Sequence, residues 1–136
     1  MAGDLYFHDV VLLLHCDGTD ASTTFVDSSR NAHTVTANGD AQVDTAQKQF
    51  GTGSALFDGG GDYLSILSHA SLNLSTGDWT IEFWLRPNST AGGQYLYAQR
   101  PHATETRGLQ ITQPGADPTK IRLAAGDSSA TAFEVD

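Results

Sequence analysis

Basic residues and cysteine are scarce in this sequence. Seven lysines and arginines stand against sixteen aspartates and glutamates, which gives a formal net charge of −9. Such an acidic surface repels phosphate backbones, so nucleic acid is excluded as an expected partner. The single cysteine, Cys16, excludes an internal disulfide.

Long hydrophobic runs are missing as well. The longest, Val10–Leu14, is much shorter than the ~20 apolar residues that span a bilayer, so no membrane insertion is expected. It also makes a poor signal peptide, because no basic residue precedes it and a polar His-Cys-Asp segment follows it. These features give a secreted origin little support, and they favour an intracellularly made protein or a virion part released by lysis. An extracellular location is the alternative.

Short β-type runs separated by turn residues make up most of the chain. Apolar and polar residues alternate in several of these runs, which is typical of strands with one face on a core. No segment shows a sustained helical period, so we expect little helix. The expected strands are Val10–Cys16, Thr24–Asp27, Thr34–Ala37, Ala41–Thr45, Ser54–Phe57, Tyr63–Leu67, Thr80–Arg86, Gln94–Gln99, Gly108–Gln113, Lys120–Ala125 and Thr131–Asp136.

Strands at this spacing indicate one all-β domain, an antiparallel two-sheet sandwich. We expect it to cover residues 10–136, after an N-terminal arm of residues 1–9. Two hairpins are predicted, one turning at Asn38–Asp40 and the other at the glycine-rich Asp58–Asp62. Glycine accepts the positive φ angles of tight turns, and aspartate bonds nearby backbone NH groups, so the acids of the second turn are expected to act locally.

The stretch Thr80–Arg86 reads TIEFWLR, with apolar residues at alternate positions. Period 2 predicts a strand whose apolar side chains face the core. The predicted core residues are Leu13, Phe57, Ile81, Phe83 and Leu85.

The order of these motifs resembles the laminin-G-like, concanavalin-A-like jelly-roll family. Leu12–Gly18 (LLLHCDG) resembles the opening strand of the family, and Asp27–His33 (DSSRNAH) stands where the family has Asp-x-Ser-Gly-Asn-Gly. Phe50–Leu64 resembles its Gly-x-Ala-x-x-Phe-Asp-Gly-x-x-Asp-Tyr hairpin, and Thr80–Arg86 its central Phe-Thr-Ile-Glu-Phe-Trp-Val strand. The resemblance implies a jelly roll, most like the versions found in bacteriophage structural proteins.

Family domains continue through further strands, including Trp-His-x-Val-Ala and Leu-Tyr-Val-Asp-Gly, that have no counterpart here. The resemblance therefore implies a jelly roll that is incomplete on its C-terminal side, with an unpaired sheet edge that recruits other strands. We expect either that another copy or another virion protein completes the sandwich, or that the sequence is part of a longer chain.

The same family includes glucanases, whose acids lie on one strand as Glu-x-Asp-x-x-Glu. Retaining glycoside hydrolysis needs two carboxylates about 5 Å apart. The chain has Glu82, Glu105 and Glu134, and only Glu134 is followed two residues later by another acid, Asp136. We therefore assign no catalytic residue and expect no enzyme; glycoside hydrolysis is the third functional alternative.

Carbohydrate binding is the main alternative function. Sugars stack on aromatic rings, and the candidates for this role are Trp84, Tyr95 and Tyr97. Trp84 is expected on the strand face opposite the predicted core residues. The competing interpretation is that Trp84 packs beneath a loop or a neighbouring strand.

No cofactor is required, although many family members hold a structural calcium. The oxygen ligands for such an ion would come from Asp17, Asp20, Asp58 and Asp62. The competing and preferred interpretation is that these aspartates cap turns. The five histidines show no paired metal-ligand spacing in the sequence.

Together these features predict a non-enzymatic structural or adhesive module on the surface of a phage particle, as head decoration, fibre or tail-associated protein. It would act by surface complementarity, with other virion proteins, copies of itself and a host surface glycan as the expected partners. A soluble lectin-like module is the alternative.

Overall fold

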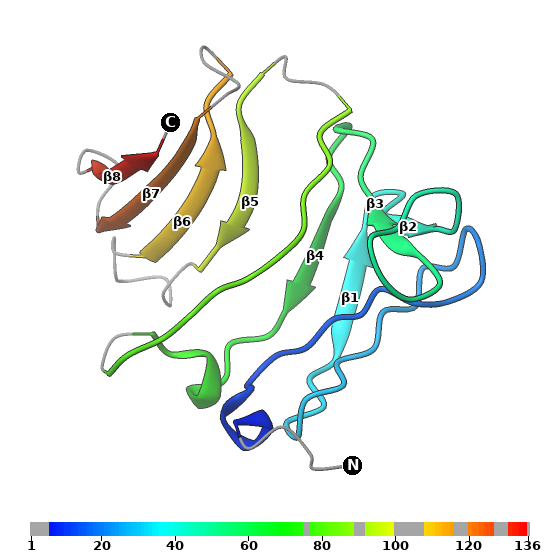
Figure 1. Cartoon of the computed structure of the whole chain (residues 1–136), viewed down its shortest axis with the longest axis horizontal. Coiled ribbons are helices and arrows are strands. Elements are labelled where there is room, and N and C mark those ends of the chain that lie inside the picture. Colours follow the sequence, from blue (N-terminus) through cyan, green and yellow to red (C-terminus); the bar gives the residue numbers. More distant parts are fainter. Residues whose placement is uncertain are drawn as a thin grey trace. The chain divides into compact units, whose positions relative to one another are not determined.

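The computed structural model describes residues 6–74, 77–88, 92–99, 108–115, 120–126 and 131–135. Its regular elements are β-strands and two single 3-10 turns, η1 (Phe7–Asp9) and η2 (Ala70–Leu72), and every pair of strands is antiparallel (Figure 1). The predicted all-β, antiparallel class is therefore confirmed. Within the described residues, no helix has the length and apolar character needed to cross a membrane.

The chain divides into two compact units, Met1–Trp84 and Leu85–Asp136, and each is described by itself. The assignment of residues 10–136 to one domain stays a prediction.

The first unit holds two pairs of antiparallel strands, and neither pair closes on one of the two predicted turns. β1 (Val35–Asn38) pairs with β4 (Tyr63–Ile66), and β2 (Gln42–Asp44) pairs with β3 (Ser54–Leu56). Both predicted hairpins are therefore wrong, since β1 does not pair with β2 and β3 does not pair with β4. Turn-forming residues indicate where regular pairing stops, but they do not determine which strands pair.

The register explains what the turn residues do instead. Asn38 lies opposite Tyr63 and Gln42 lies opposite Leu56, so residues 39–41 face the longer segment 57–62. The glycine-rich run is thus a wide interruption between two ladders, comparable to a large β-bulge. It lets the chain pass from one strand pair to the other and gathers the acids that flank it.

The core of the first unit is small and centres on β2. Val43 is 1% exposed, and Phe25 and Ala41 are also buried. Gly53 packs directly on this core: a Cβ there would lie 2.7 Å from Val43 Cγ1. A larger residue at position 53 would therefore collide with Val43, the largest fully buried side chain of the unit.

Buried Asp27 joins three segments around this core. Its Oδ1 accepts hydrogen bonds from the amides of Leu13 (3.0 Å) and Ser29 (2.8 Å), and its Oδ2 accepts from Ser29 Oγ (2.9 Å) and the His33 amide (2.8 Å). Burial opposes ionisation of this carboxyl, but the hydrogen-bond donors outweigh it and lower its pKa. Asp27 is therefore the main polar tie between the N-terminal segment and the turn at residues 28–33.

The predicted strand Val10–Cys16 is largely absent. Its one ladder contact is the isolated bridge between Leu14 and Asp27, and Thr24–Asp27 contributes a second bridge from Val26 to Thr34. The Asp27 carboxylate takes the Leu13 amide, a donor that a regular ladder would use. The run is half-buried apart from exposed Val11 and His15. It is held by the Asp27 carboxylate and by a hydrogen bond from the Ser28 amide to the Leu13 carbonyl, and not by a regular ladder.

Ala32 has a left-handed backbone, with φ of +47°. We expect Ala32→Gly to raise the free energy of unfolding by up to about 1 kcal/mol, because a left-handed backbone strains alanine by about 1–2 kcal/mol and the extra unfolded-state entropy of glycine offsets part of the gain. Denaturant melts measure the change. The control Ala37→Gly, inside β1, should instead lower stability, and a loss at both positions would contradict the interpretation.

The second unit is one four-stranded antiparallel sheet in the order β5-β6-β7-β8. Its strands are β5 (Gln94–Ala98), β6 (Gly108–Gln113), β7 (Ile121–Gly126) and β8 (Thr131–Val135). All four lie within or close to the predicted ranges, and Gly108–Gln113 matches to the residue. The register places Tyr97, Ile111 and Leu123 on one face with buried Leu109, so this sheet has an apolar side.

The predicted strand Thr80–Arg86 does not form: the described residues 77–88 contain no strand. Ile81 is half-buried, while Phe83 and Leu85 are 48% and 46% exposed, so their assignment to the core is wrong. Alternation predicts an apolar face, but a strand also needs a hydrogen-bonded neighbour, and none of the described strands pairs with this stretch. Of the other predicted core residues, Leu13 is half-buried and Phe57 is exposed, because it opens the 57–62 interruption.

Candidate functional site

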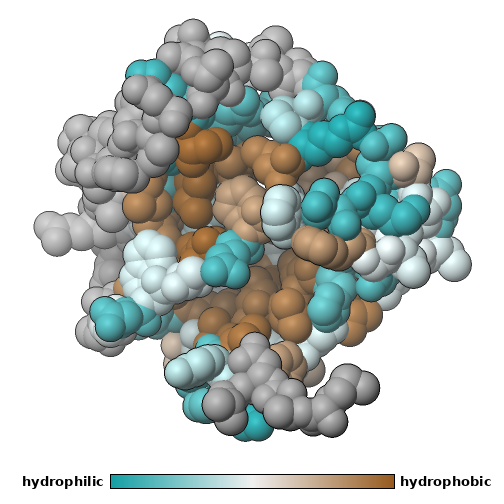
Figure 2. Space-filling model, viewed as in Figure 1, coloured by the Kyte–Doolittle hydropathy of each residue, from teal (hydrophilic) through white to brown (hydrophobic). Residues whose placement is uncertain are grey.

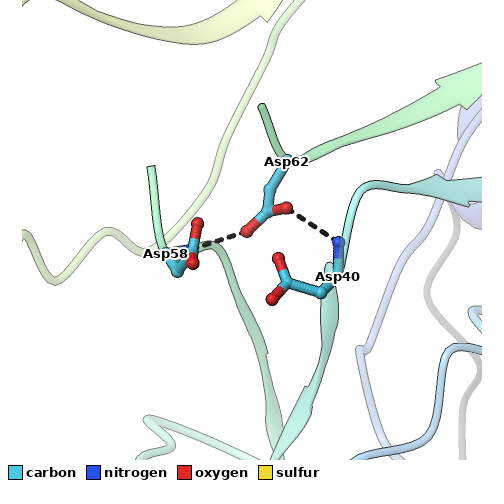
Figure 3. Close-up of side chains that lie close together, drawn as sticks. All are labelled: Asp40, Asp58 and Asp62. Atoms are coloured by element: carbon cyan, nitrogen blue, oxygen red, sulfur yellow. Dashed lines mark hydrogen bonds between the residues drawn. The ribbon is translucent and has the colours of Figure 1, made fainter. Parts of the chain in front are cut away.

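Three acids cluster where the ladders of the first unit are interrupted. Asp40 follows β1, while Asp58 and Asp62 lie between β3 and β4 (Figure 3). One carboxylate oxygen from each lies within 4.8 Å of the others. Asp40 and Asp58 are exposed and Asp62 is half-buried. We call these three residues the acidic cluster.

Backbone amides occupy much of the acceptor capacity of the acidic cluster. Asp62 accepts hydrogen bonds from the amides of Asp40 (2.9 Å) and Asp58 (2.7 Å), and Asp58 Oδ1 accepts from the Gly60 amide (2.6 Å). Gly39 lies so close that a Cβ there would be 2.3 Å from Asp62 Oδ1. The prediction that Asp58 and Asp62 act locally on the glycine-rich segment is confirmed.

The crowded carboxylates shift one another's ionisation. Hydrogen bonding to Asp62 raises the pKa of Asp40, and the negative charges of Asp58 and Asp62 add to the effect. The pKa of Asp62 is lowered, chiefly by the amides of Asp58 and Asp40. Asp62 is therefore the preferred anion and Asp40 the preferred site for a shared proton.

The other two predicted calcium ligands lie elsewhere, so the four-aspartate set is wrong. Asp17 accepts from the amide and hydroxyl of Thr52, and Asp20 accepts from the amide and hydroxyl of Thr45. The Thr52 amide bond is the largest cause of the lowered pKa of Asp17. These acids fix the two ends of the loop between β2 and β3, which is the turn-capping role that the sequence favoured.

Asp40 was not predicted from the sequence, because its approach to Asp58 and Asp62 depends on the pairing of β1 with β4. The acidic cluster offers oxygen ligands of the kind that calcium takes. However, both oxygens of Asp62 already accept amide hydrogens, so the arrangement fits a self-capped turn better than an open cation cage.

We expect Asp40→Asn to raise the thermal midpoint at neutral pH. The pKa of Asp40 is raised, so ionised Asp40 destabilises the folded state. This loss of stability grows as pH rises from the unfolded-state pKa of 3.8 through the higher folded-state pKa. The gain should vanish near about pH 3, where Asp40 is protonated in both states. Melts of the variant at both pH values measure this.

The control is Asp78→Asn, which removes one charge from an exposed residue outside the acidic cluster. A chelator should leave the midpoint of the unmodified chain almost unchanged. If millimolar calcium raised that midpoint and Asp40→Asn abolished the rise, calcium would be a ligand of the acidic cluster and the self-capped interpretation would fall.

Of the three predicted sugar-binding aromatic residues, Trp84 belongs to the first unit, and Tyr95 and Tyr97 belong to the second. Trp84 is 73% exposed and contacts Phe50 edge-to-face, with ring centroids 5.6 Å apart. Next to it is a shallow depression lined by residues 81–84. Phe50, which the sequence analysis did not select, is therefore the aromatic partner of Trp84.

Tyr95 and Tyr97 lie on opposite faces of their sheet. A bulge between them places Tyr95 opposite Thr112 and Tyr97 opposite Ile111, and these neighbours on β6 point to opposite sides. Tyr95 is exposed, whereas burial raises the pKa of the half-buried Tyr97. Tyr95 and Tyr97 therefore cannot stack on one sugar from the same face of the sheet.

The carboxylates considered for hydrolysis are only partly described. Glu82 is exposed beside the shallow depression, and Glu134 belongs to β8. Glu105 and Asp136 lie outside the described residues. The expectation that the chain is not an enzyme stays a prediction.

No family model matches the sequence, and no curated protein matches it. A solved structure does match: part of an S-layer domain-containing protein from Clostridium thermocellum, with a TM-score of 0.69 and 19% sequence identity. The match covers 91% of this chain and 55% of the other, so the chain spans about half the length of that solved structure. At this identity the likeness shows a shared fold alone.

Proposed function

We propose that this chain is a non-enzymatic structural or adhesive module of a virion surface, built as a laminin-G-like, concanavalin-A-like jelly roll. The observation that carries the proposal is the imbalance between buried and exposed apolar side chains. Among the described residues, four apolar residues are buried and thirteen large hydrophobic ones are exposed, Leu67 at 86%. Figure 2 shows hydrophobic side chains reaching the surface on the face it displays.

Each unit also has an apolar sheet face that is only half-buried. In the first, Val35 and Ala37 of β1 lie opposite Ile66 and Leu64 of β4, and all four are half-buried. In the second, Tyr97, Ile111 and Leu123 share a face and are also half-buried. Large apolar patches on a protein surface mark association sites. We therefore propose copies of this chain and other virion proteins as the partners.

The solved structure that shares the fold comes from an S-layer domain-containing protein. This origin is compatible with a surface module outside a virion, so an extracellular location remains the alternative.

Sedimentation velocity over about 1–100 µM tests the proposal, because self-association can be measured with the purified chain alone. The intact chain should shift from monomer to larger species as concentration rises. Leu67→Lys and Val26→Lys add charge to side chains that are 86% and 64% exposed, so each should weaken association without unfolding the chain.

The matched control is Thr36→Lys, at an exposed polar position of β1, which should associate like the unmodified chain. An intact chain that stays a folded monomer at about 100 µM would contradict self-association through these side chains.

Carbohydrate binding is the second candidate, and the exposed Phe50–Trp84 pair favours it. The edge-to-face pair presents ring surface for stacking, and the Glu82 carboxylate beside it can accept hydrogen bonds from sugar hydroxyls. On a glycan array, a specific signal should be lost in Trp84→Ala and reduced in Phe50→Ala. Tyr95→Ala, an exposed tyrosine of the other unit, should keep it.

An array without any specific signal would remove the lectin candidate and leave the association proposal intact. Glycoside hydrolysis stays the third alternative.

A further inference from the structure

Two histidines that lie far apart in the sequence converge on one hydroxyl group. His33 Nε2 is 3.1 Å from Ser71 Oγ, and His69 Nδ1 is 2.8 Å from the same oxygen. The imidazole rings contact each other edge-to-face, with centroids 4.9 Å apart. No spacing rule along the sequence reveals this pair, because the pair joins the turn before β1 to the turn after β4.

Both histidines are held in place by their surroundings. The backbone amide of His33 donates to buried Asp27, at 2.8 Å. His69 is the N-cap of η2, and its Nδ1 accepts a hydrogen bond from the Ser71 amide at 3.2 Å. The pair is therefore organised before any ligand arrives, which lowers the entropic cost of binding.

The hydrogen bonds also indicate where the ring lone pairs lie. Because His69 Nδ1 accepts from an amide, it carries a lone pair directed toward Ser71. The single hydroxyl proton of Ser71 can serve only one of the two rings at a time. Neutral His33 carries its proton on either Nε2 or Nδ1. When the proton is on Nδ1, Nε2 also carries a lone pair, which is directed toward Ser71 Oγ.

We propose that His33 and His69 form a binding site for a divalent transition-metal ion of the Zn²⁺ type. Neutral imidazole is a preferred ligand of zinc, and two nitrogens that already approach one point need only a small closing movement to bind at about 2.0–2.1 Å. His69 is exposed and His33 is half-buried, so water can reach the ion and fill its remaining positions. Calcium and magnesium are disfavoured because they take oxygen ligands.

The bound ion would act as a cross-link between the two turns. It would replace the hydrogen bonds between the imidazoles and Ser71 and join the two segments that flank one end of the β1–β4 pair. The acidic chain, with a formal net charge of −9, favours the approach of a cation.

Calorimetric titration of the intact chain with Zn²⁺ near neutral pH tests this site. We expect one ion per chain and a dissociation constant in the micromolar range. His33→Asn and His69→Asn should each weaken binding by about tenfold or more. Asparagine is chosen at position 69 because it is a good N-cap residue, so η2 keeps an acceptor and the variant should fold.

Two further variants test whether the paired imidazoles themselves bind the ion. Ser71→Ala removes the shared hydroxyl but keeps both imidazole ligands. Because the ion replaces the hydrogen bonds to that hydroxyl, binding should change by less than about threefold. His15→Asn removes an exposed histidine beside Cys16 and should leave binding unchanged. Metal-free melts show whether each variant is folded.

The proposal is overturned if the intact chain shows no saturable binding below about 1 mM Zn²⁺. It is also overturned if folded His33→Asn and His69→Asn bind as tightly as the unmodified chain. In either case the two histidines would serve only as the hydrogen-bonded cap of η2.

Discussion

Asp27→Ala should lower the free energy of unfolding by about 3–5 kcal/mol. The substitution removes the acceptor for three backbone amides and one hydroxyl, from Leu13, Ser29 and His33. Each donor left without a partner in the interior costs free energy. Chemical denaturation of the variant measures the loss, and a cost below about 1 kcal/mol would show that water replaces the carboxylate.

Asp27→Asn provides the matched test of charge, since the amide keeps one acceptor oxygen. The pKa of Asp27 is lowered in the folded state, so its ionisation stabilises the protein above the unfolded value of 3.8 and the contribution is lost as pH falls below it. The variant should therefore lose less stability on acidification than the unmodified chain. An identical acid transition in both proteins would rule out this linkage.

Val43→Ala is expected to cost about 2–3 kcal/mol, because it opens a cavity at a side chain that is 1% exposed. The space has rigid walls, since both Gly18 and Gly53 lie against the valine methyl groups and have no side chain that could move in. Val26→Ala is the control: at 64% exposure it should change stability by less than about 0.5 kcal/mol. Equal costs at the two positions would mean that the core has been placed wrongly.

The sequence predicted where the chain is extended better than it predicted which strands meet. The ranges of β3 and β5–β8 follow from local alternation and flanking turn residues, which act over a few residues. The pairing of β1 with β4 depends on contacts between segments about 28 residues apart, which local propensity does not contain. The prediction of a strand at Thr80–Arg86 was wrong for the same reason. Its apolar and polar residues do alternate, but none of the described strands pairs with it.

The candidate sites show the same limit. Asp58 and Asp62 were recognisable beside the glycines, but Asp40 joins them only through the β1–β4 register. In a regular strand, Tyr95 and Tyr97 would point to the same face, because they are two residues apart. The bulge between them places their side chains on opposite faces. His33 and His69 meet through long-range packing, so the absence of a histidine motif in the sequence was a poor guide.

We propose that this chain is an assembly module whose sheets associate with other copies. In the four-stranded sheet the outer strands are β5 and β8, and outer strands are the ones that recruit further strands. Amide hydrogen exchange at about 1 µM and about 100 µM, followed strand by strand, measures this association. We expect exchange in β5 or β8 to slow by about tenfold or more at the higher concentration, while exchange in the inner strand β6 changes little. Exchange in β8 that is already as slow as in β6 at the lower concentration, and that does not change with concentration, would contradict it.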